Sequence, residues 1–219
     1  GWRAIRMCLD EPELFKTQLR ALMRAAVHGD VRIMLPLIVS VDEVREARSL
    51  LAEAARELAE RGVTHRDDVP LGIMIETPAA VLTADTLARE VAFFSIGTND
   101  LVQYTLAVDR GNARLATRFT PLHPGVLRLI DRALQAGRDQ GLDVSVCGEM
   151  ASEPLMAFAL IGLGLRTLSV APRSVARVKQ IVRGIHVRVA EEAAREALAA
   201  GTAHAAEEIL QARLTAELG

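Results

Sequence analysis

Short runs of apolar residues alternate with longer amphipathic stretches along most of the chain. Five of these runs have the length of a β-strand, and they span residues 31–39, 71–76, 91–97, 143–148 and 166–171. The runs are apolar at consecutive positions rather than at every second position, which is typical of strands that are buried on both faces. This pattern predicts an α/β fold in which helices cover a parallel sheet.

Polar residues that typically start helices follow the strand-sized runs. Ser40 and Glu43 have the spacing of a capping box and open an amphipathic stretch. Thr77 is expected to cap a helix whose first residue is Pro78. Near the amino terminus, Asp10 is expected to cap a helix that no strand precedes. Strand and helix signals therefore alternate along the chain.

Two architectures fit this alternation, a doubly wound sheet and a (β/α)8 barrel. A closed barrel needs about eight strands, and a barrel whose first strands lie upstream of Gly1 explains both the lower strand count and the helical start. We therefore expect a (β/α)8 TIM barrel over residues 1–185 that lacks its first strands. The alanine-rich sequence of residues 186–219 predicts two helices that pack on the barrel. The first is expected to end, and the second to begin, near Gly201 and Thr202.

Composition narrows the class of protein further. Half of the 219 residues are hydrophobic, the formal net charge is -2, and no polybasic tract stands out, so nucleic acid and anionic membrane are not expected as partners. The two cysteines, Cys8 and Cys147, lie far apart, which fits a reducing cytosol better than a disulfide framework. The longest apolar runs are too short to span a bilayer. We expect a cytoplasmic protein without membrane insertion.

Polar residues gather where the predicted strands end. The carboxyl ends of parallel strands meet at one rim, so the side chains that follow them share a space. The residues at these positions are Glu76, Thr98, Asn99, Asp100, Cys147, Gly148 and Glu149. Two carboxylates from adjacent strands can share one hard divalent cation and leave its other positions to water and substrate oxygens, as magnesium prefers. The rim therefore predicts a magnesium site.

Two arginines add positive charge to this rim. Arg110 and Arg3 each offer a planar guanidinium that can hold a carboxylate or a phosphate. A cation and arginines around one concave rim suit a small phosphorylated acid.

Each of these residues also has a purely structural interpretation. Thr98 or Asn99 can cap the next helix, and Glu76 can be a surface residue. Cys147 can be a small buried hydrophobic residue, and Cys8 fits the same packing role. The five histidines lack the spacing of metal ligands.

Four segments of the chain carry a resemblance to a known family. They read PLGIMIETPAA, FFSIGTNDLVQYTLAVDRGN, PLHPGVLRLI and VSVCGEMA. Together they closely resemble the carboxyl-terminal domain of the Enzyme I family, the phosphoenolpyruvate-protein phosphotransferases of the bacterial sugar phosphotransferase system. Pyruvate phosphate dikinases and phosphoenolpyruvate synthases look similar around the Gly-Thr-Asn-Asp turn, but the YTLAVDRGN and CGEMA segments resemble Enzyme I more.

The resemblance implies a role for each matched residue. Glu76 and Asp100 match the magnesium ligands of the family, and Asn99 and Asp100 lie in its substrate-binding segment. Asn99 matches a residue that contacts the phosphate of phosphoenolpyruvate. Arg3 and Arg110 match arginines that clamp the phosphate and the carboxylate of this substrate. Cys147 matches the general acid that protonates the enolate of departing pyruvate.

The resemblance also implies a fold, partners and alternatives. It implies a phosphoenolpyruvate/pyruvate-type barrel whose phosphoryl group passes to a histidine on a separate domain and then to the carrier protein HPr, in a homodimer. The barrels of that family begin before the Gly-Trp-Arg segment, so we expect a fragment that does not complete phosphotransfer alone. The alternatives are a fragment of a dikinase or synthase relative, and a truncated module that only binds or dimerises.

Overall fold

Five parallel strands form the single sheet of the molecule. The computed structural model describes residues 1–219. The strands are β1 (Ile33–Leu35), β2 (Leu71–Ile75), β3 (Phe93–Gly97), β4 (Asp143–Cys147) and β5 (Thr167–Leu168), and they lie side by side in chain order. Every strand-sized run predicted from the sequence therefore contains a strand, although each strand is shorter than its run.

The two faces of the sheet differ in burial. On one face, the paired residues Ile73 and Phe94 are completely buried, and so is the pair of Ile75 and Ile96. The opposite face carries Met34, whose exposed fraction is 38%. Ser95, on the same face as Met34, is 6% exposed, so this face is buried less completely than the other and the expectation that both faces are buried holds only in part.

The order of the strands in the sheet excludes one of the two predicted architectures. A doubly wound sheet reverses its strand order at a switch point, whereas this order runs from β1 to β5 without reversal. Because parallel strands are joined by right-handed crossovers, a steady order places all connecting helices on the same face. The doubly wound alternative is therefore wrong. The (β/α)8 barrel is not confirmed either, because the sheet is open and has five strands.

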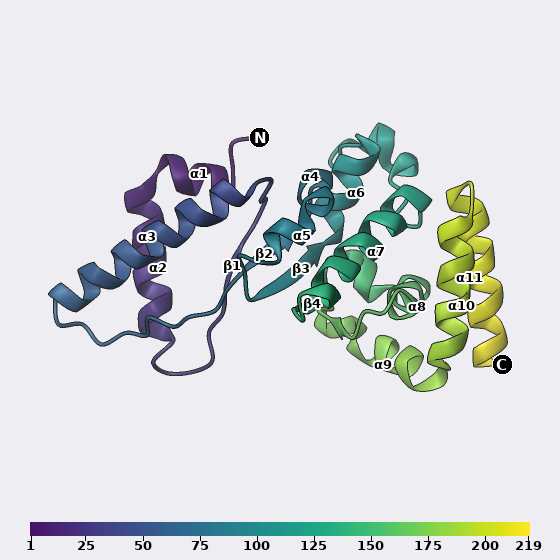
Figure 1. The fold of residues 1–219 in the computed structure, drawn as a ribbon. Helices are drawn as coiled ribbons and strands as arrows, with labels where there is room; N and C mark the ends of the chain where they lie inside the picture. The colour runs from purple at the N-terminus through teal and green to yellow at the C-terminus, as the bar shows by residue number, and fades with distance from the viewer.

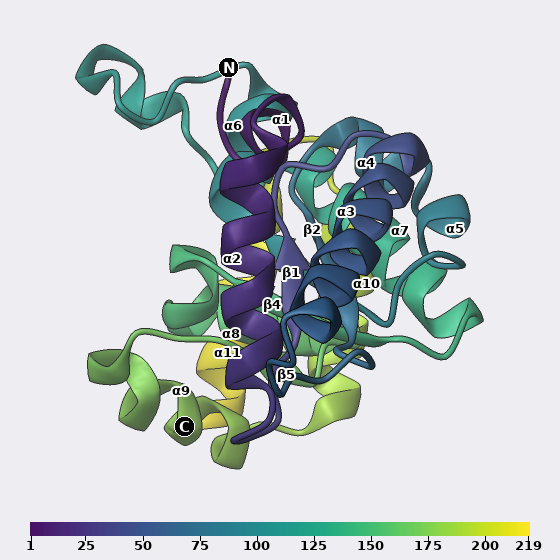
Figure 2. The same cartoon turned by 90° about the vertical axis from the view of Figure 1, so that its left-hand side faces the viewer.

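Helices connect the strands and extend the chain at both ends (Figure 1). They are α1 (Ile5–Asp10), α2 (Pro12–Ala25), α3 (Val41–Glu60), α4 (Pro78–Leu82), α5 (Ala84–Leu87), α6 (Thr98–Leu106), α7 (Pro124–Asp139), α8 (Pro154–Gly162), α9 (Val175–Gly184), α10 (Val187–Ala199) and α11 (Ala203–Leu218). Short 3₁₀ helices are η1 (Ala113–Arg118), η2 (Glu149–Ser152) and η3 (Pro172–Ser174). Figures 1 and 2 show α1, α2 and α3 at the β1 end of the molecule, with α10 and α11 at the opposite end. No helix combines the length and the apolar character needed to cross a bilayer.

The starts of α3 and α4 follow the sequence signals, whereas the caps considered at Asp10 and at Thr98 or Asn99 are not formed. The Ser40 hydroxyl accepts a hydrogen bond from the Glu43 N–H, and the Glu43 carboxylate accepts one from the Ser40 N–H, so the capping box opens α3 as predicted. Thr77 caps α4, and Pro78 is its first residue, also as predicted. Asp10 does not cap a helix. It is the last residue of α1, and its carboxylate accepts a 2.6 Å hydrogen bond from the Trp2 indole.

The carboxyl-terminal helices pack closely on α8. The chain breaks between α10 and α11 at residues 200–202, where the sequence predicts it. Residues 157–161 of α8 are buried, and α10 presents buried alanines to it, including Ala190 and Ala194. A Cβ atom placed on Gly162 would lie 2.1 Å from the carbonyl oxygen of Ala190. Because backbone cannot move aside as a flexible side chain can, this contact requires glycine.

Substitution of this glycine tests the α8 and α10 contact. We expect Gly162→Ala to lower the free energy of unfolding by about 2–3 kcal/mol, because overpacking against backbone is strongly destabilising. Gly201→Ala is the matched control, since a Cβ there meets nothing within 4 Å. It should change stability by less than about 0.5 kcal/mol. Chemical denaturation of the three proteins measures the difference, and equal stabilities would contradict the close packing.

Candidate functional site

The predicted site residues lie at the carboxyl ends of β2, β3 and β4. Glu76 follows β2 directly, Asn99 and Asp100 are in the first turn of α6 directly after β3, and Cys147 ends β4. Gly97 pairs with Cys147 in the register of β3 and β4, so the ends of these two strands are level. The structure thus brings the residues to one edge of the sheet, as the parallel arrangement requires.

Glu76 is a buried carboxylate with one oxygen engaged. Its side chain accepts a 2.7 Å hydrogen bond at Oε1 from the N–H of Leu37, a residue in the left-handed region with φ of 59°. Its Oε2 accepts no hydrogen bond. A Cβ atom on Gly97 would lie 2.7 Å from Oε2, so glycine leaves the space that this carboxylate occupies. Burial raises the pKa of Glu76, and the charge of Asp100 also raises it, whereas Leu37, Arg3 and Arg110 oppose the shift.

Asp100 is buried between two guanidinium groups. Arg3 donates a hydrogen bond through Nη2 to Oδ2 of Asp100, and Nη2 of Arg110 lies 4.0 Å from Oδ1. The same Arg3 nitrogen lies 3.2 Å from the Tyr104 hydroxyl, to which it also donates. The hydrogen bond to Asp100 raises the pKa of Arg3. Asp100, Arg3 and Arg110 therefore form one charged cluster beside Glu76.

Asn99 and Cys147 lie on the side of the site that faces β4. Oδ1 of Asn99 accepts a 3.3 Å hydrogen bond from the N–H of Glu149. The Thr98 hydroxyl donates a 3.1 Å hydrogen bond to the carbonyl oxygen of Cys147. A Cβ atom on Gly148 would lie 2.4 Å from the Thr98 hydroxyl oxygen, and φ of Gly148 is 110°. The turn after β4 is thus joined tightly to the start of α6.

The two cysteines have different surroundings. Sγ of Cys147 lies 3.6 Å from both the Ser95 hydroxyl and the carbonyl oxygen of Ile96, and the residue is half-buried. Cys8 packs against the apolar core, and burial raises the pKa of its thiol. The packing role predicted for Cys8 agrees with this position, and Cys147 lies among the residues at the strand ends.

Two residues of the site were not found from the sequence. Leu37 holds Glu76 through its backbone, and no side-chain pattern could have indicated that contact. Tyr104 is one helical turn after Asp100, so the spacing of four residues places both on one face of α6, a signal that could have been used.

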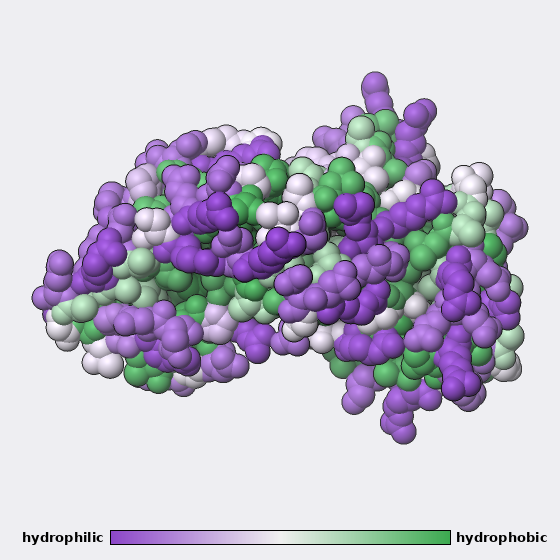
Figure 3. All heavy atoms as spheres, in the orientation of Figure 1, coloured by the Kyte–Doolittle hydropathy of each residue, from purple (hydrophilic) through white to green (hydrophobic).

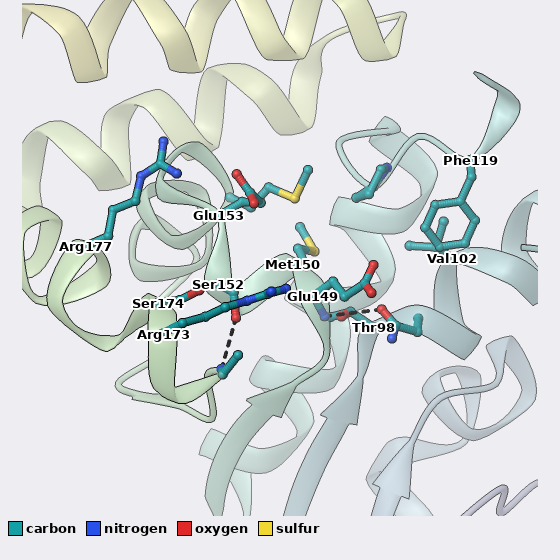
Figure 4. A pocket seen from close by; sticks show the side chains of 14 residues that line it. Thr98, Val102, Phe119, Glu149, Met150, Ser152, Glu153, Arg173, Ser174 and Arg177 are labelled. Carbon is teal, nitrogen blue, oxygen red and sulfur yellow. Dashed lines mark hydrogen bonds between the residues drawn. The ribbon is translucent and has the colours of Figure 1, made fainter. Parts of the chain in front are cut away.

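A cleft of about 590 Å³ adjoins this cluster. Its lining residues are Thr98, Asn99, Val102, Phe119, Pro121, Glu149, Met150, Ser152, Glu153, Met156, Ala171, Arg173, Ser174 and Arg177. Figure 4 shows Arg173 reaching across the cleft toward Met150 and Glu149, with Thr98 on the other side. The cleft includes Asn99 but not Glu76, Asp100 or Cys147, so it extends the site rather than containing it.

The donor set suits a hard cation held by few protein ligands. Glu76 has an oxygen without a hydrogen-bond donor, and Asp100 lies close enough for its charge to act on Glu76. No group of three or more histidine, cysteine, aspartate or glutamate side chains could hold a metal ion. A site with two carboxylates fits magnesium, which keeps several water or phosphate oxygens, and does not fit the richer ligand sets of structural zinc.

Comparisons with known proteins now extend these observations. A family model described as the PEP-binding domain of PEP-utilising enzymes matches residues 1–187. Among curated proteins, the chain is 41% identical over 211 residues to the phosphoenolpyruvate-protein phosphotransferase of Haemophilus influenzae. It is 42% identical over 217 residues to the protein of that name from Listeria monocytogenes. These matches cover 96% and 99% of this chain, and 37% and 38% of the relatives.

A solved structure supports the fold alone. A citrate lyase from Burkholderia xenovorans is similar with a TM-score of 0.56 and 21% sequence identity, over 92% of this chain and 67% of that one. The chain spans about a third of the length of the curated relatives that it matches. Because the family model covers most of the residues and the relatives are more than 40% identical, the resemblance noted in the sequence is confirmed. The chain belongs to the family of PEP-utilising enzymes and contains their PEP-binding domain.

Proposed function

We propose that this chain is the phosphoenolpyruvate- and magnesium-binding part of a phosphoenolpyruvate-protein phosphotransferase. The main support is the cluster at the strand ends, where two acidic and two basic side chains meet in a chain whose relatives carry that name. The parent enzyme would transfer the phosphoryl group to a histidine on a separate domain, from which it passes to HPr. We place this activity in the cytoplasm, in a homodimer.

The same proposal includes the architecture. The five strands with their sequential order and one more fully buried face would be an arc of a (β/α)8 barrel over residues 1–185. The half-exposed face with Met34 would then be the barrel interior, closed by strands of a longer parent chain. Residues 186–219 would be a helical extension that packs on the barrel through α8.

Substrate binding would require an exchange of partners around Asp100. Arg3 now occupies one oxygen of Asp100, and Arg110 faces the other. Glu76 and Asp100 would hold a magnesium ion, which when bound neutralises the charge on the phosphoryl oxygens. Arg3 and Arg110 would then turn from Asp100 to the phosphate and carboxylate of phosphoenolpyruvate. Asn99 would contact the phosphate from the side of the cleft.

Cys147 would act after the phosphoryl group leaves. The bond between phosphorus and the enol oxygen breaks, a bond to the imidazole nitrogen of the acceptor forms, and the enolate remains. A proton from the Cys147 thiol to the methylene carbon gives pyruvate, and the thiolate regains its proton from water. The half-buried position of Sγ beside Ser95 supports this role.

The carboxylates of Glu76 and Asp100 are expected to determine the affinity for magnesium. In the full-length parent protein, Glu76→Gln and Asp100→Asn should each weaken magnesium binding by about tenfold or more, because each removes a charged oxygen ligand. Titration calorimetry with magnesium measures this, and labelling of the protein from radioactive phosphoenolpyruvate should fall in parallel. Asp85→Asn, at an exposed position of α5, is the control and should bind normally. Unchanged labelling in both site variants would refute the proposal.

Arg3 is expected to affect the cation and the substrate in opposite directions. Arg3→Gln removes the charge that competes for Asp100, so magnesium alone should bind a few-fold more tightly. Phosphoenolpyruvate at saturating magnesium should bind about tenfold more weakly, because a charge-assisted hydrogen bond is lost. Calorimetry of both ligands gives the two affinities, with Arg6→Gln on the exposed side of α1 as the control. If both affinities fall together, the exchange of partners is wrong.

Cys147 should affect turnover rather than binding. Cys147→Ala is expected to slow pyruvate formation by about 100-fold or more, the usual loss for a general acid. The affinity for phosphoenolpyruvate should stay within about twofold, because the thiol does not hold the phosphate. Rapid-quench measurement of pyruvate in the full-length parent protein gives the rate, and Cys8→Ala serves as the control cysteine. Pyruvate formation at the normal rate would remove Cys147 from the mechanism.

A further inference from the structure

One stretch of the chain is strongly basic although the net charge of the chain is close to zero. Residues 154–190 contain no aspartate or glutamate. Their basic residues are Arg166, Arg173, Arg177, Lys179, Arg183 and Arg188. The overall composition conceals this asymmetry, because the acidic residues lie elsewhere. Four of the six, Arg173, Arg177, Lys179 and Arg183, lie on η3 and α9.

The basic side chains of η3 and α9 have no acidic partners. None of the four residues forms an ion pair, whereas Arg166 pairs with Glu191 at 3.7 Å. In the orientation of Figure 3, hydrophilic side chains project from the lower edge of the molecule, where Figure 1 places α9. Helix α9 thus presents uncompensated positive charge to solvent.

Helix α9 also leaves apolar side chains uncovered. It buries only Val178 and Ile181, whereas Val175 is 42% exposed and Val182 is 51% exposed. Helix α9 therefore buries few of its own residues and exposes both basic and apolar side chains. This composition is typical of a protein-binding surface.

The cleft connects α9 to the candidate site. Arg173 and Arg177 line one part of the cleft, and Asn99 lines another. Asn99 accepts a hydrogen bond from the N–H of Glu149, so the wall of the cleft is fixed to the turn after β4. The carboxylates of Glu149 and Glu153 also line the cleft and have no ion-pair partners. A group that enters the cleft therefore reaches Asn99, whereas Asp100, Arg3 and Arg110 do not line the cleft.

We propose that η3, α9 and this cleft form the docking surface for the protein segment that accepts the phosphoryl group, and that the segment presents an acidic face. This inference rests on the proposed function, because it assumes that Asn99 contacts the transferred phosphate. The acidic face pairs with Arg177, Lys179 and Arg183, and the acceptor side chain enters the cleft beside Asn99.

The surface fits a protein better than a small anion. Lys179 and Arg183 lie outside the cleft. A ligand that pairs with both of them and with Arg177 is therefore larger than the cleft itself. The exposed valines add apolar area that a free phosphate would not cover. Complementary charge on the partner raises the rate of association and fixes its orientation more than it raises affinity.

Charge reversal on α9 tests the docking surface. The triple variant Arg177→Glu, Lys179→Glu and Arg183→Glu is made in the full-length parent protein. Single-turnover transfer from labelled phosphoenolpyruvate to the protein should slow about tenfold at low salt, and the difference should narrow at high salt because salt screens charges. Calorimetry should give unchanged affinities for magnesium and phosphoenolpyruvate, which also demonstrates that the variant is folded.

The matched control carries the same change of charge elsewhere. Arg24→Glu, Arg56→Glu and Arg61→Glu alter exposed residues without ion pairs at the α2 and α3 end of the molecule. This control should transfer the phosphoryl group at the normal rate. If both triple variants are equally slow, the effect is one of net charge and the docking surface is wrong.

A second variant tests the cleft without altering basic residues. Glu153 is exposed, lines the cleft and makes no side-chain hydrogen bond. Glu153→Trp should fill the cleft and slow transfer at least tenfold at every salt concentration, while substrate binding is kept.

The outcomes separate this inference from the proposed function. If the unmodified protein binds neither magnesium nor phosphoenolpyruvate, the proposed function fails. If it binds both, and neither the α9 variant nor Glu153→Trp slows transfer, only the docking surface fails. If the α9 variant transfers normally but loses binding to vesicles of anionic phospholipid, the basic face serves a membrane and the inference is overturned.

Discussion

The buried carboxylate of Asp100 is the group on which the candidate site depends. It lies in the first turn of α6, directly after β3, and its two oxygens face Arg3 and Arg110. With Glu76 close by, two negative and two positive charges balance within one cluster. A buried charge is costly unless it is paired, so the two arginines lower the cost of burying Asp100. Under the proposed function, a cation and an anionic substrate would enter together by exchange of partners, because each new charge would replace one already present.

The backbone provides the space in which that cluster forms. Gly97 leaves room for the Glu76 carboxylate, and Gly148 lets the turn after β4 approach Thr98. Leu37 adopts a left-handed conformation that costs about 1 kcal/mol or more in a residue with a side chain. Its N–H then points at Glu76, where the hydrogen bond offsets part of that cost. The site geometry is therefore determined as much by small or strained backbone positions as by the charged side chains.

The sequence predicts the elements of this fold better than their assembly. Strand runs and capping signals such as Ser40 with Glu43 are local, so they can be recognised without knowledge of distant contacts. The apolar runs did not indicate that one sheet face is less completely buried, because Met34 looks like a core residue in any local window. At the site, the strand-end rule places Glu76 and Asp100 together, but the pairing of Asp100 with Arg3 joins residues 97 positions apart and has no local signal.

Two surfaces of the molecule lack the partners that their chemistry calls for. Arg32 lies over the Phe93 ring at 5.7 Å, on the face of the sheet that carries the exposed Met34. The basic residues of α9, Arg177, Lys179 and Arg183, form no ion pair with any carboxylate of the chain. In the proposed function, both surfaces would face other parts of a longer enzyme, and the relatives are about three times as long as this chain. Additional strands would cover the first surface permanently. The second surface lies beside the cleft that Arg173 and Arg177 line. Exposed charge suits a transient contact, because water and salt solvate it between encounters.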